Sequence, residues 1–311
     1  MFSIFKEPKF NFQAIRRLFL VVSGVAMAAG IYSIVYLAQG KANLGTDFGG
    51  GVLLHLTSTQ DLKLEDLRSA CDRVGYKDAQ IQKISGPGMK GFKAVVRIRR
   101  ALDTGVGTLG TQAVADLQKE MPNSGLVLEG SEEVGPAVSA KLRDDAIKAF
   151  LLSMLGILVY IAYRFDFRFG IISVIATVHD ILVMMAILIL GGFEFNLLSI
   201  TAILTISGYS LNDTVVIFDR IRENMKLVGR MNYPDMINQS LNETLNRTVN
   251  TGGTVLASLV PVYVIGGEVL HDFSLALIVG ILVGTYSSIF VAAATLTEWH
   301  LAAMAGKTQA A

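Results

Sequence analysis

Residues 197–218 read LLSITAILTISGYSLNDTVVIF. The stretch is long enough to cross the hydrocarbon of a bilayer as one helix, because a thickness of roughly 30 Å needs about 20 residues. Small and polar residues interrupt it, however, and it contains one acid, Asp213. Such residues inside a membrane helix usually face other helices or a hydrated path instead of lipid. The stretch therefore predicts a helix in the interior of a membrane bundle.

Apolar runs of similar length occur elsewhere in the chain. Of its 311 residues, 52% are hydrophobic and only 17% are charged, whereas soluble proteins have about 25% charged residues. The net charge of +1 gives no basic field that would attract nucleic acid. We therefore predict a polytopic α-helical protein of the lipid bilayer with six spans, near residues 18–38, 145–163, 170–191, 197–218, 247–266 and 273–296.

The distribution of Lys and Arg among the short loops predicts the orientation. Basic residues precede the first predicted span and follow the second and the fourth, whereas the loops after the third and fifth carry acids and no Lys or Arg. Because Lys and Arg stay on the cytoplasmic side, both termini are expected in the cytoplasm. Residues 1–39 then form the cytoplasmic N-terminus and first span, 40–143 a periplasmic domain, 144–298 the remaining spans and 299–311 a cytoplasmic tail.

A cleaved signal peptide is an alternative for the first span. Arg16-Arg17 followed by an apolar run could open a twin-arginine signal. The run is longer than the roughly 7–15 residues of a signal core, and further spans follow it. An uncleaved membrane anchor explains the same residues and is the favoured interpretation.

The segment between the first two spans has the pattern of a small α+β domain. Its elements follow in the order βαββαβ, which is the ferredoxin-like arrangement. It contains no catalytic triad, metal-ligand cluster or Walker-type phosphate loop, and the single cysteine, Cys71, is expected to be buried. We therefore expect a binding or lever domain without enzymatic activity, with strands at 51–57, 78–84, 92–99 and 125–132 and helices at 61–75 and 108–121.

Ionisable residues inside the spans are the strongest candidates for function, because each is costly in hydrocarbon. Asp213 lies in the fourth span and Arg247 near the start of the fifth, so the two can meet at one level of the membrane. A carboxylate beside a guanidinium stays ionised, and its affinity for a proton changes when the guanidinium moves away. The pair therefore predicts a proton path; the alternative is a static ion pair that only fixes helix register.

The third span contains a second candidate, His179 next to Asp180. Adjacent positions of a helix point to different faces, so the two side chains are not expected to share a proton with each other. One would face the bundle and the other a neighbouring chain. A functional and a structural role are both compatible with the sequence.

Several stretches resemble the SecF family, subunits of the bacterial protein-export machine that belong to the resistance-nodulation-division (RND) superfamily. The most specific is LNDTVVIFDRIREN at 211–224 in the fourth span, and DFGGG at 47–51, VHD at 178–180 and LNRT at 245–248 support it. The glycine-rich run at 248–254 departs from the family pattern. The resemblance covers essentially the whole chain and implies an RND-like bundle with one periplasmic domain.

The resemblance also implies partners and a mechanism. A SecF-like subunit of the bacterial inner membrane would pair with SecD, associate with the SecYEG channel and YajC, and use the proton motive force to move or release an unfolded polypeptide. By position, the proton path falls on Asp213 and Arg247, with Asp180, His179 and Asn212 as candidate accessories. SecD would supply further carboxylates, and no metal or other cofactor is implied besides the proton gradient.

Two other functions fit parts of the sequence. An RND-type exporter of small molecules or lipids usually has a second large external loop, whereas residues 191–196 form only a short turn. An intramembrane aspartyl protease needs two facing aspartates that share a proton, and a cation such as Arg247 beside Asp213 disfavours that arrangement. The sequence therefore favours protein export, with the exporter as the alternative.

Overall fold

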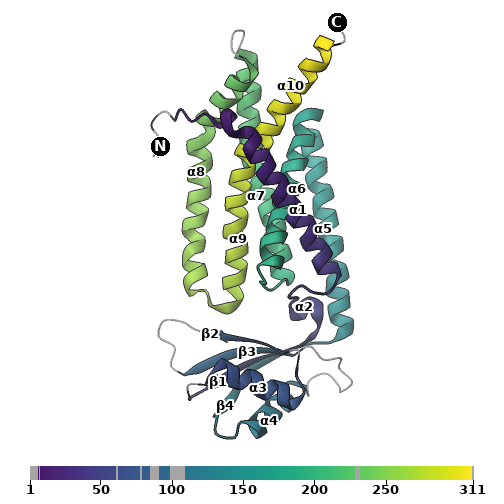
Figure 1. The fold of residues 1–311 in the computed structure, drawn as a ribbon, viewed down its shortest axis with the longest axis vertical. Coiled ribbons are helices and arrows are strands. Elements are labelled where there is room, and N and C mark those ends of the chain that lie inside the picture. The colour runs from purple at the N-terminus through teal and green to yellow at the C-terminus, as the bar shows by residue number, and fades with distance from the viewer. Residues whose placement is uncertain are drawn as a thin grey trace. The chain divides into compact units, whose positions relative to one another are not determined.

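The computed structural model describes residues 6, 8–60, 62–77, 79–84, 91–98, 109–227 and 232–309. The chain divides into two compact units, both visible in Figure 1. The helical unit comprises Met1–Asn43, Phe150–Glu194 and Leu198–Ala311. The sheet unit comprises Leu44–Ala149 together with Phe195–Leu197.

In the part of the chain that the structure describes, six helical segments are long and apolar enough to cross a membrane, in agreement with the predicted number of spans. The last of them is composite, because α9 continues through a π-helical turn, η2, into α10. In chain order the elements are η1 (Phe12–Ile15), α1 (Arg16–Ala38), α5 (Pro136–Arg164), α6 (Phe167–Leu190), α7 (Leu197–Leu227), α8 (Tyr233–Ile265), α9 (Gly267–Ser287), η2 (Ser288–Ala292) and α10 (Ala293–Gln309).

α8 begins well before the predicted fifth span. Its first turns are polar, but Met236, Ile237 and Leu241 share one buried face, so the helix continues as an amphipathic segment beyond the apolar run. The Asn232 side chain caps its start by accepting a hydrogen bond of 3.0 Å from the backbone N–H of Asp235. An apolar run alone therefore marks the part of a helix in lipid and not the whole helix.

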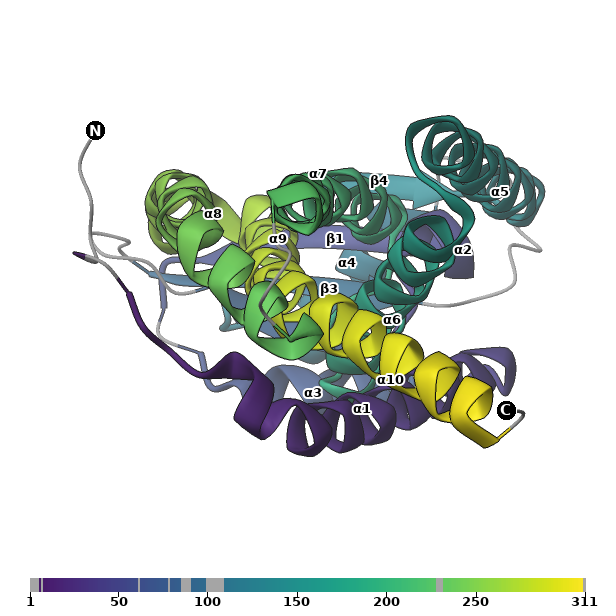
Figure 2. The same cartoon turned by 90° about the horizontal axis from the view of Figure 1, so that it is seen from above.

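The helices differ in how much of their surface the helical unit covers. Of the most apolar stretch, 56% is buried in α6 and 50% in α7 and in the last span, but only 11% in α5 and in α8. α6 packs against α1 and α9, and α8 packs against α9. Figure 2 accordingly has α5 and α8 near opposite edges, with α6, α7 and α9 between them. The buried fourth span agrees with its predicted interior position.

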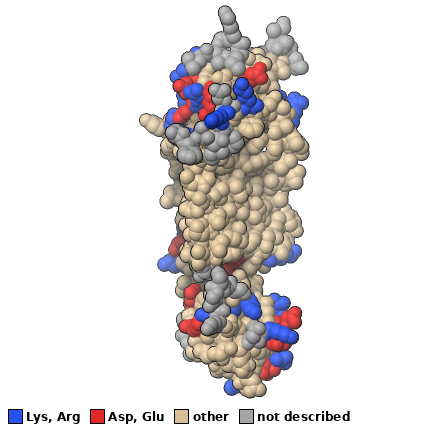
Figure 3. Space-filling model, turned by 90° about the vertical axis from the view of Figure 1, so that its left-hand side faces the viewer, with Lys and Arg blue, Asp and Glu red and all other residues tan. Residues whose placement is uncertain are grey.

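Charged residues gather where α1 begins and α7 and α10 end, beyond a broad uncharged band of the helical unit (Figure 3). Ion pairs join the helices there. Arg16 pairs with Glu298 at 2.8 Å and Arg220 with Glu243 at 2.6 Å, while Arg164 pairs with Asp219. These contacts tie α1 to α10, α7 to α8 and α5 to α7.

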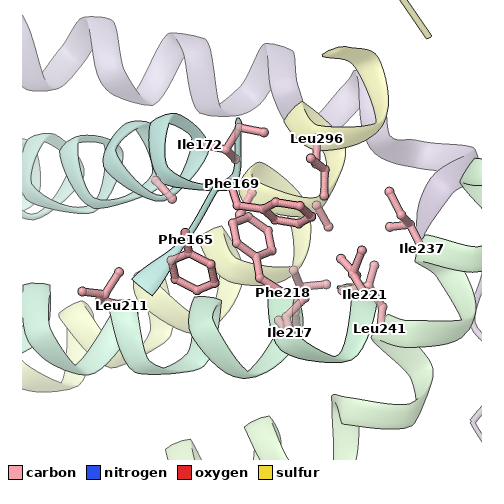
Figure 4. Packing of buried hydrophobic residues seen from close by; sticks show 14 of the residues in the cluster. Phe165, Phe169, Ile172, Leu211, Ile217, Phe218, Ile221, Ile237, Leu241 and Leu296 are labelled. Atoms are coloured by element: carbon pink, nitrogen blue, oxygen red, sulfur yellow. The ribbon is translucent and has the colours of Figure 1, made fainter. Parts of the chain in front are cut away.

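An aromatic core packs beneath these charges (Figure 4). The ring centroid of Phe218 on α7 lies 5.9 Å from that of Phe165 and 5.1 Å from that of Phe169. Ile237 and Leu241 of α8 belong to the same buried cluster. The part of α7 that lies one helical turn and more beyond Asp213 is therefore held in place by packing against α6 and α8.

The sheet unit has the predicted ferredoxin-like topology. Its four strands form an antiparallel sheet in the order β2-β3-β1-β4, with α3 and α4 on one face (Figure 1). Burial raises the pKa of the Cys71 thiol in its core to about 11, so the thiol stays protonated. The sequence Gly-Pro-Gly at 86–88, which predicts a turn between the second and third strands, lies outside the described residues. The elements are α2 (Thr46–Gly49), β1 (Gly51–Ser58), α3 (Leu64–Val74), β2 (Gln80–Ile84), β3 (Phe92–Ile98), α4 (Leu109–Glu120) and β4 (Leu126–Val134).

The start of α7 belongs to the sheet unit. The backbone N–H of Gly45 donates to the carbonyl of Phe195 at 3.0 Å, and the Asp47 carboxylate accepts from the N–H of Leu197, the first residue of α7, at 3.1 Å. The first N–H groups of a helix have no partner within it. Asp47 therefore caps the helix that carries Asp213.

Candidate functional site

Asp213 lies on the buried face of α7. Three buried hydroxyl-bearing residues, Ser207, Ser210 and Thr214, lie near it on α7 together with buried apolar residues such as Ile206 and Ile217. Asp213 itself is 3% exposed, and its Oδ2 atom has no hydrogen-bond partner among the described residues. An acid in this state has an open oxygen that can gain a proton or another partner.

Arg247 lies on α8 and interacts electrostatically with Asp213. Among the described residues, however, no ion pair joins the two side chains, and Arg247 is exposed at the surface of the helical unit. Asp213 and Arg247 therefore interact electrostatically in the structure but do not form an ion pair. A static ion pair, the alternative offered by the sequence, is not present in this arrangement.

Two further buried hydroxyls near these residues also lack hydrogen-bond partners. Tyr209 precedes Asp213 by one helical turn and interacts with it electrostatically, and Thr248 directly follows Arg247. Both lie within motifs quoted above, but the sequence did not single them out, because hydroxyl residues are common in membrane helices. Unpaired buried polar atoms are rare in folded proteins, so their proximity in sequence to Asp213 and Arg247 makes this region the strongest candidate for a functional site.

A second acid, Asp180, has the opposite character. It is fully buried, and three helices supply its hydrogen bonds. Its Oδ2 accepts from the hydroxyl of Ser210 on α7 and, at 2.9 Å, from the hydroxyl of Ser287 on α9. Its Oδ1 lies 2.9 Å from His179 Nδ1. Asp180 therefore holds α6, α7 and α9 together, one turn along α7 from Asp213.

The prediction that His179 and Asp180 do not pair is wrong. Both side chains are about 1% exposed and both point into the bundle. Successive residues are separated by about 100° around a helix, but here packing surrounds α6 over a wide arc, so both positions are interior. The long imidazole side chain then reaches its neighbour's carboxylate, which the rule for helix faces does not exclude.

Ser287 and the adjacent Tyr286 are functional candidates that the sequence did not reveal. The Tyr286 hydroxyl lies 2.8 Å from Ser23 Oγ of α1, and its ring centroid lies 6.0 Å from that of His179. The available signal was the polar interruption GTYSS at 284–288 in an otherwise apolar span, which ends at the π-helical turn η2. π-Helical turns are frequent at functional sites.

Gly284 on α9 allows this helix to approach Ser210 on α7 closely, so that Ser210 and Ser287 can both bind the Asp180 carboxylate. A Cβ atom at this position would lie 2.8 Å from Cβ of Ser210. We expect Gly284→Ala to separate α7 from α9, weaken the bond from Ser210 to Asp180 and lower the free energy of unfolding by about 1–3 kcal/mol. Chemical unfolding in detergent measures this change.

Gly24→Ala is the matched control for this substitution. A Cβ atom on Gly24 meets nothing within 4 Å, so alanine should leave stability unchanged or raise it by about 0.5–1 kcal/mol. Equal effects of the two substitutions would contradict the assigned role of Gly284.

The structure also places the glycine-rich run after Arg247 and the candidate accessory residue Asn212. The glycine-rich run after Arg247 fits helix packing, because a Cβ atom added at Gly252 would lie 3.3 Å from Thr285 Oγ1 and 3.7 Å from Ile281 Cγ2 on α9. Asn212 is exposed on α7, away from the buried acids. In the described part of the chain, no cluster of His, Cys, Asp and Glu could hold a metal ion.

Proteins similar to this chain in sequence and fold are named protein translocase subunits. A family model described as protein export membrane protein SecD/SecF, C-terminal, matches residues 114–302. The chain is 41% identical over 294 residues to a protein translocase subunit SecF of Thermodesulfovibrio yellowstonii, which covers 94% of this chain and 95% of the relative. It is 37% identical over 295 residues to the protein translocase subunit SecDF of Thermus thermophilus, of which it covers 39%.

Solved structures agree with these matches. A crystal structure of SecDF from Thermus thermophilus, described as a translocon-associated membrane protein, matches with a TM-score of 0.80 and 35% identity over 94% of this chain and 39% of that one. A SecDF structure in a super-membrane-facing form matches with a TM-score of 0.70 and 34% identity. The predicted resemblance and RND-like fold class are thereby confirmed. The chain belongs to the SecD/SecF family of protein-export membrane proteins and is a SecF-type subunit of the Sec translocase.

Proposed function

We propose that this subunit uses the proton motive force to promote translocation or release of an unfolded polypeptide, with Asp213 and Arg247 on the proton path. The observation that carries the proposal is the state of Asp213, a buried acid with an open oxygen and a cation nearby but not paired with it. The test is polypeptide export by proteoliposomes with and without a proton gradient, comparing the wild type with Asp213→Asn.

The energetics of a buried acid support this role. An ionised carboxylate inside a membrane is costly unless a partner compensates its charge, whereas the protonated form is cheaper there. Gain or loss of a proton at Asp213 therefore changes the relative free energy of arrangements that differ in the distance to Arg247. A gradient that loads the proton from one side and removes it on the other can then drive the change of arrangement.

The connection between Asp213 and the sheet unit supports coupling to work outside the membrane. α7 carries Asp213 and begins in the sheet unit, where Asp47 caps it. α5 also continues from the sheet unit into the helical unit without a break. Movement of α7 would therefore be transmitted to the sheet unit, the proposed lever that acts on the emerging polypeptide.

The Asp47 cap provides a test of this transmission. Asp47→Ala removes a helix cap worth about 1 kcal/mol. When the whole of this energy is lost from the step in which α7 moves the sheet unit, gradient-stimulated export falls about fivefold. Asp47→Asn keeps an oxygen that can accept from Leu197 and should remain close to the wild type. Export kinetics in proteoliposomes measure both variants, and full stimulation in Asp47→Ala would argue against this route.

SecD is the proposed partner, and exposed polar stripes support a helical neighbour. Thr201, Thr205, Gly208 and Asn212 share an exposed face of α7 at helical spacing. Small and polar residues on a membrane helix favour contact with another helix over contact with lipid. Arg247, also exposed here, would then meet SecD instead of hydrocarbon, and further carboxylates of SecD would complete the proton path.

Photo-cross-linking can test this face. A photoreactive residue at Thr205 should cross-link to SecD, whereas one at Leu152, which is 71% exposed on α5, should cross-link to lipid. Cross-links to SecD from Leu152 alone would assign the interface to the other side of the bundle. Co-purification with the tagged chain would show whether SecYEG and YajC accompany SecD.

The orientation completes the proposal. α1 begins with Arg16, α6 begins beside Arg168 and α7 ends soon after Arg222. The start of α1 and the end of α7 lie at the end of the helical unit where α10 also ends (Figure 1), while the turn between α6 and α7 carries Glu194. The preference of Lys and Arg for the cytoplasm supports cytoplasmic termini and a periplasmic sheet unit in the bacterial inner membrane. The similar proteins are named protein translocase subunits and not enzymes. The proposed proton movement requires no catalytic residue in this chain.

A further inference from the structure

The His179–Asp180 pair has one atom for which the described residues offer no partner. His179 is 1% exposed, and its Nε2 atom is buried without a hydrogen bond. Every other polar atom of the pair is engaged: Nδ1 with Asp180 Oδ1, and Asp180 Oδ2 with the hydroxyls of Ser210 and Ser287. The hydrogen-bond network is therefore complete except at Nε2.

All of these bonds are satisfied when the Asp180 carboxylate is ionised: both serine hydroxyls donate to Oδ2, and an Nδ1–H group can donate to Oδ1. In this state Nε2 is a bare lone pair, and the pair carries one negative charge in a buried position. A proton added at Nε2 removes that net charge. After this uptake the pair holds two protons. One is on Nε2, and the other is shared between Nδ1 and the Asp180 carboxylate, because the two groups titrate as a unit.

Among the described residues around the pair, no cation balances the charge in another way. In the described part of the chain, His179 is the only charged or titratable group that acts on Asp180. The helices packed against α6 contribute Tyr286 from α9, and Tyr209 and Asp213 lie beside Ser210 in the sequence of α7. Among the side chains that the structure describes on α1 and α10, Arg16 and Arg17 pair with Glu298, and His300 stacks on Tyr233 of α8.

We infer that His179 and Asp180 form a second proton-binding site of the bundle, separate from Asp213, at which His179 Nε2 takes up the proton. The lone pair of Nε2 takes one proton from solution, and no covalent bond is broken in the protein. Ser210 on α7 and Ser287 on α9 both donate hydrogen bonds to the Asp180 carboxylate on α6. Proton uptake by the pair therefore changes the strength of the contacts that join these three helices. The physiological meaning of this site rests on the proposed proton-coupled function, but its existence does not.

The chain offers a matched control for this inference. His271 is also followed by an aspartate, and its Nδ1 lies 3.1 Å from Asp272 Oδ1, but these side chains are 42% and 27% exposed. Only four histidines occur in the chain. Two full-length single-histidine chains can therefore be made by replacing the others with glutamine, one that retains His179 and one that retains His271.

Nitrogen-15 NMR of histidine in these chains, reconstituted in lipid bilayers, tests the site. Lowering the pH from about 9 to about 5 spans the range in which histidine changes charge. For His179 we expect a single transition of Nε2 from bare to protonated. Asp180→Asn keeps an oxygen acceptor but removes the charge, and it should weaken proton uptake at Nε2 at least tenfold. Asp272→Asn should change uptake at the exposed His271 by less than threefold.

Two results would overturn the inference. One is an Nε2 atom of His179 that stays bare over the whole range, and the other is a transition that Asp180→Asn leaves unchanged. If Asp180→Asn does not fold, Ser287→Ala removes one donor to the carboxylate and should still move the transition. The titration of the unmutated pair alone also decides whether Nε2 takes a proton.

The same chains distinguish this inference from the proposed function. Asp213→Asn should leave the Nε2 transition of His179 in place while it abolishes gradient-driven export. A normal transition together with gradient-driven export in Asp213→Asn would reject the role of Asp213 and retain the second site. Loss of the transition with export still dependent on Asp213 would reject the second site alone.

Discussion

Asp213→Asn is expected to reduce export under a proton gradient to the rate measured without one. Asparagine has nearly the same shape but cannot bind or release a proton, so the buried position no longer changes charge. One elementary charge crossing 100 mV provides about 2.3 kcal/mol, which corresponds to a rate factor of at most about 50. The loss should therefore be complete and up to that size, and time courses of polypeptide export in proteoliposomes measure it.

Asp219→Asn is the control for this substitution. Asp219 lies on the same helix but is 41% exposed and pairs with Arg164 at the end of the bundle. A partly exposed ion pair contributes little to stability, so stimulation by the gradient should persist in this variant. If Asp213→Asn retained stimulation as well, a proton role for Asp213 would have to be abandoned.

Removal of the sheet is expected to abolish the same stimulation without preventing membrane insertion. Gly51 on β1 pairs with Val134 on β4, so the two ends of the segment 51–134 lie side by side. A short Gly/Ser linker from Gly50 to Gly135 can therefore replace the sheet and leave Asp47 at the start of α7. The helical unit has its own buried core, so it should still insert and still cross-link to SecD from Thr205.

The outcome separates a lever from a passive domain. Export with full gradient stimulation in the linker variant would contradict the proposed action of the sheet unit on the polypeptide. Loss of stimulation with insertion and the SecD cross-link intact would support it, because the proton site would remain while its output was absent.

The sequence predicted the fold because strong, simple patterns specify it. Runs of about 20 apolar residues leave few structures other than membrane helices, and all six appear in the structure. The order of strands and helices in the sheet unit follows from local periodicity in the same way. Boundaries were less predictable, as α8 illustrates, because its polar first turns are helical only through the burial of Met236, Ile237 and Leu241.

The candidate site was predictable in part. Asp213 and Arg247 stand out because charges are rare in membrane spans, and the structure adds that they interact without forming an ion pair. The pairing of His179 with Asp180 was mispredicted, since the rule for helix faces ignores how many neighbours surround a helix. The hydroxyls of Ser210 and Ser287 could not be assigned, because their role depends on contacts between helices that are distant in sequence.

Proton entry into proteoliposomes that contain this subunit, SecD and the channel tests the central claim most directly. With a pH-sensitive dye inside the vesicles and a gradient imposed across the membrane, the wild type should take up protons as export proceeds, and Asp213→Asn should show only the passive leak of protein-free vesicles. Equal proton entry in the two proteins would contradict the account.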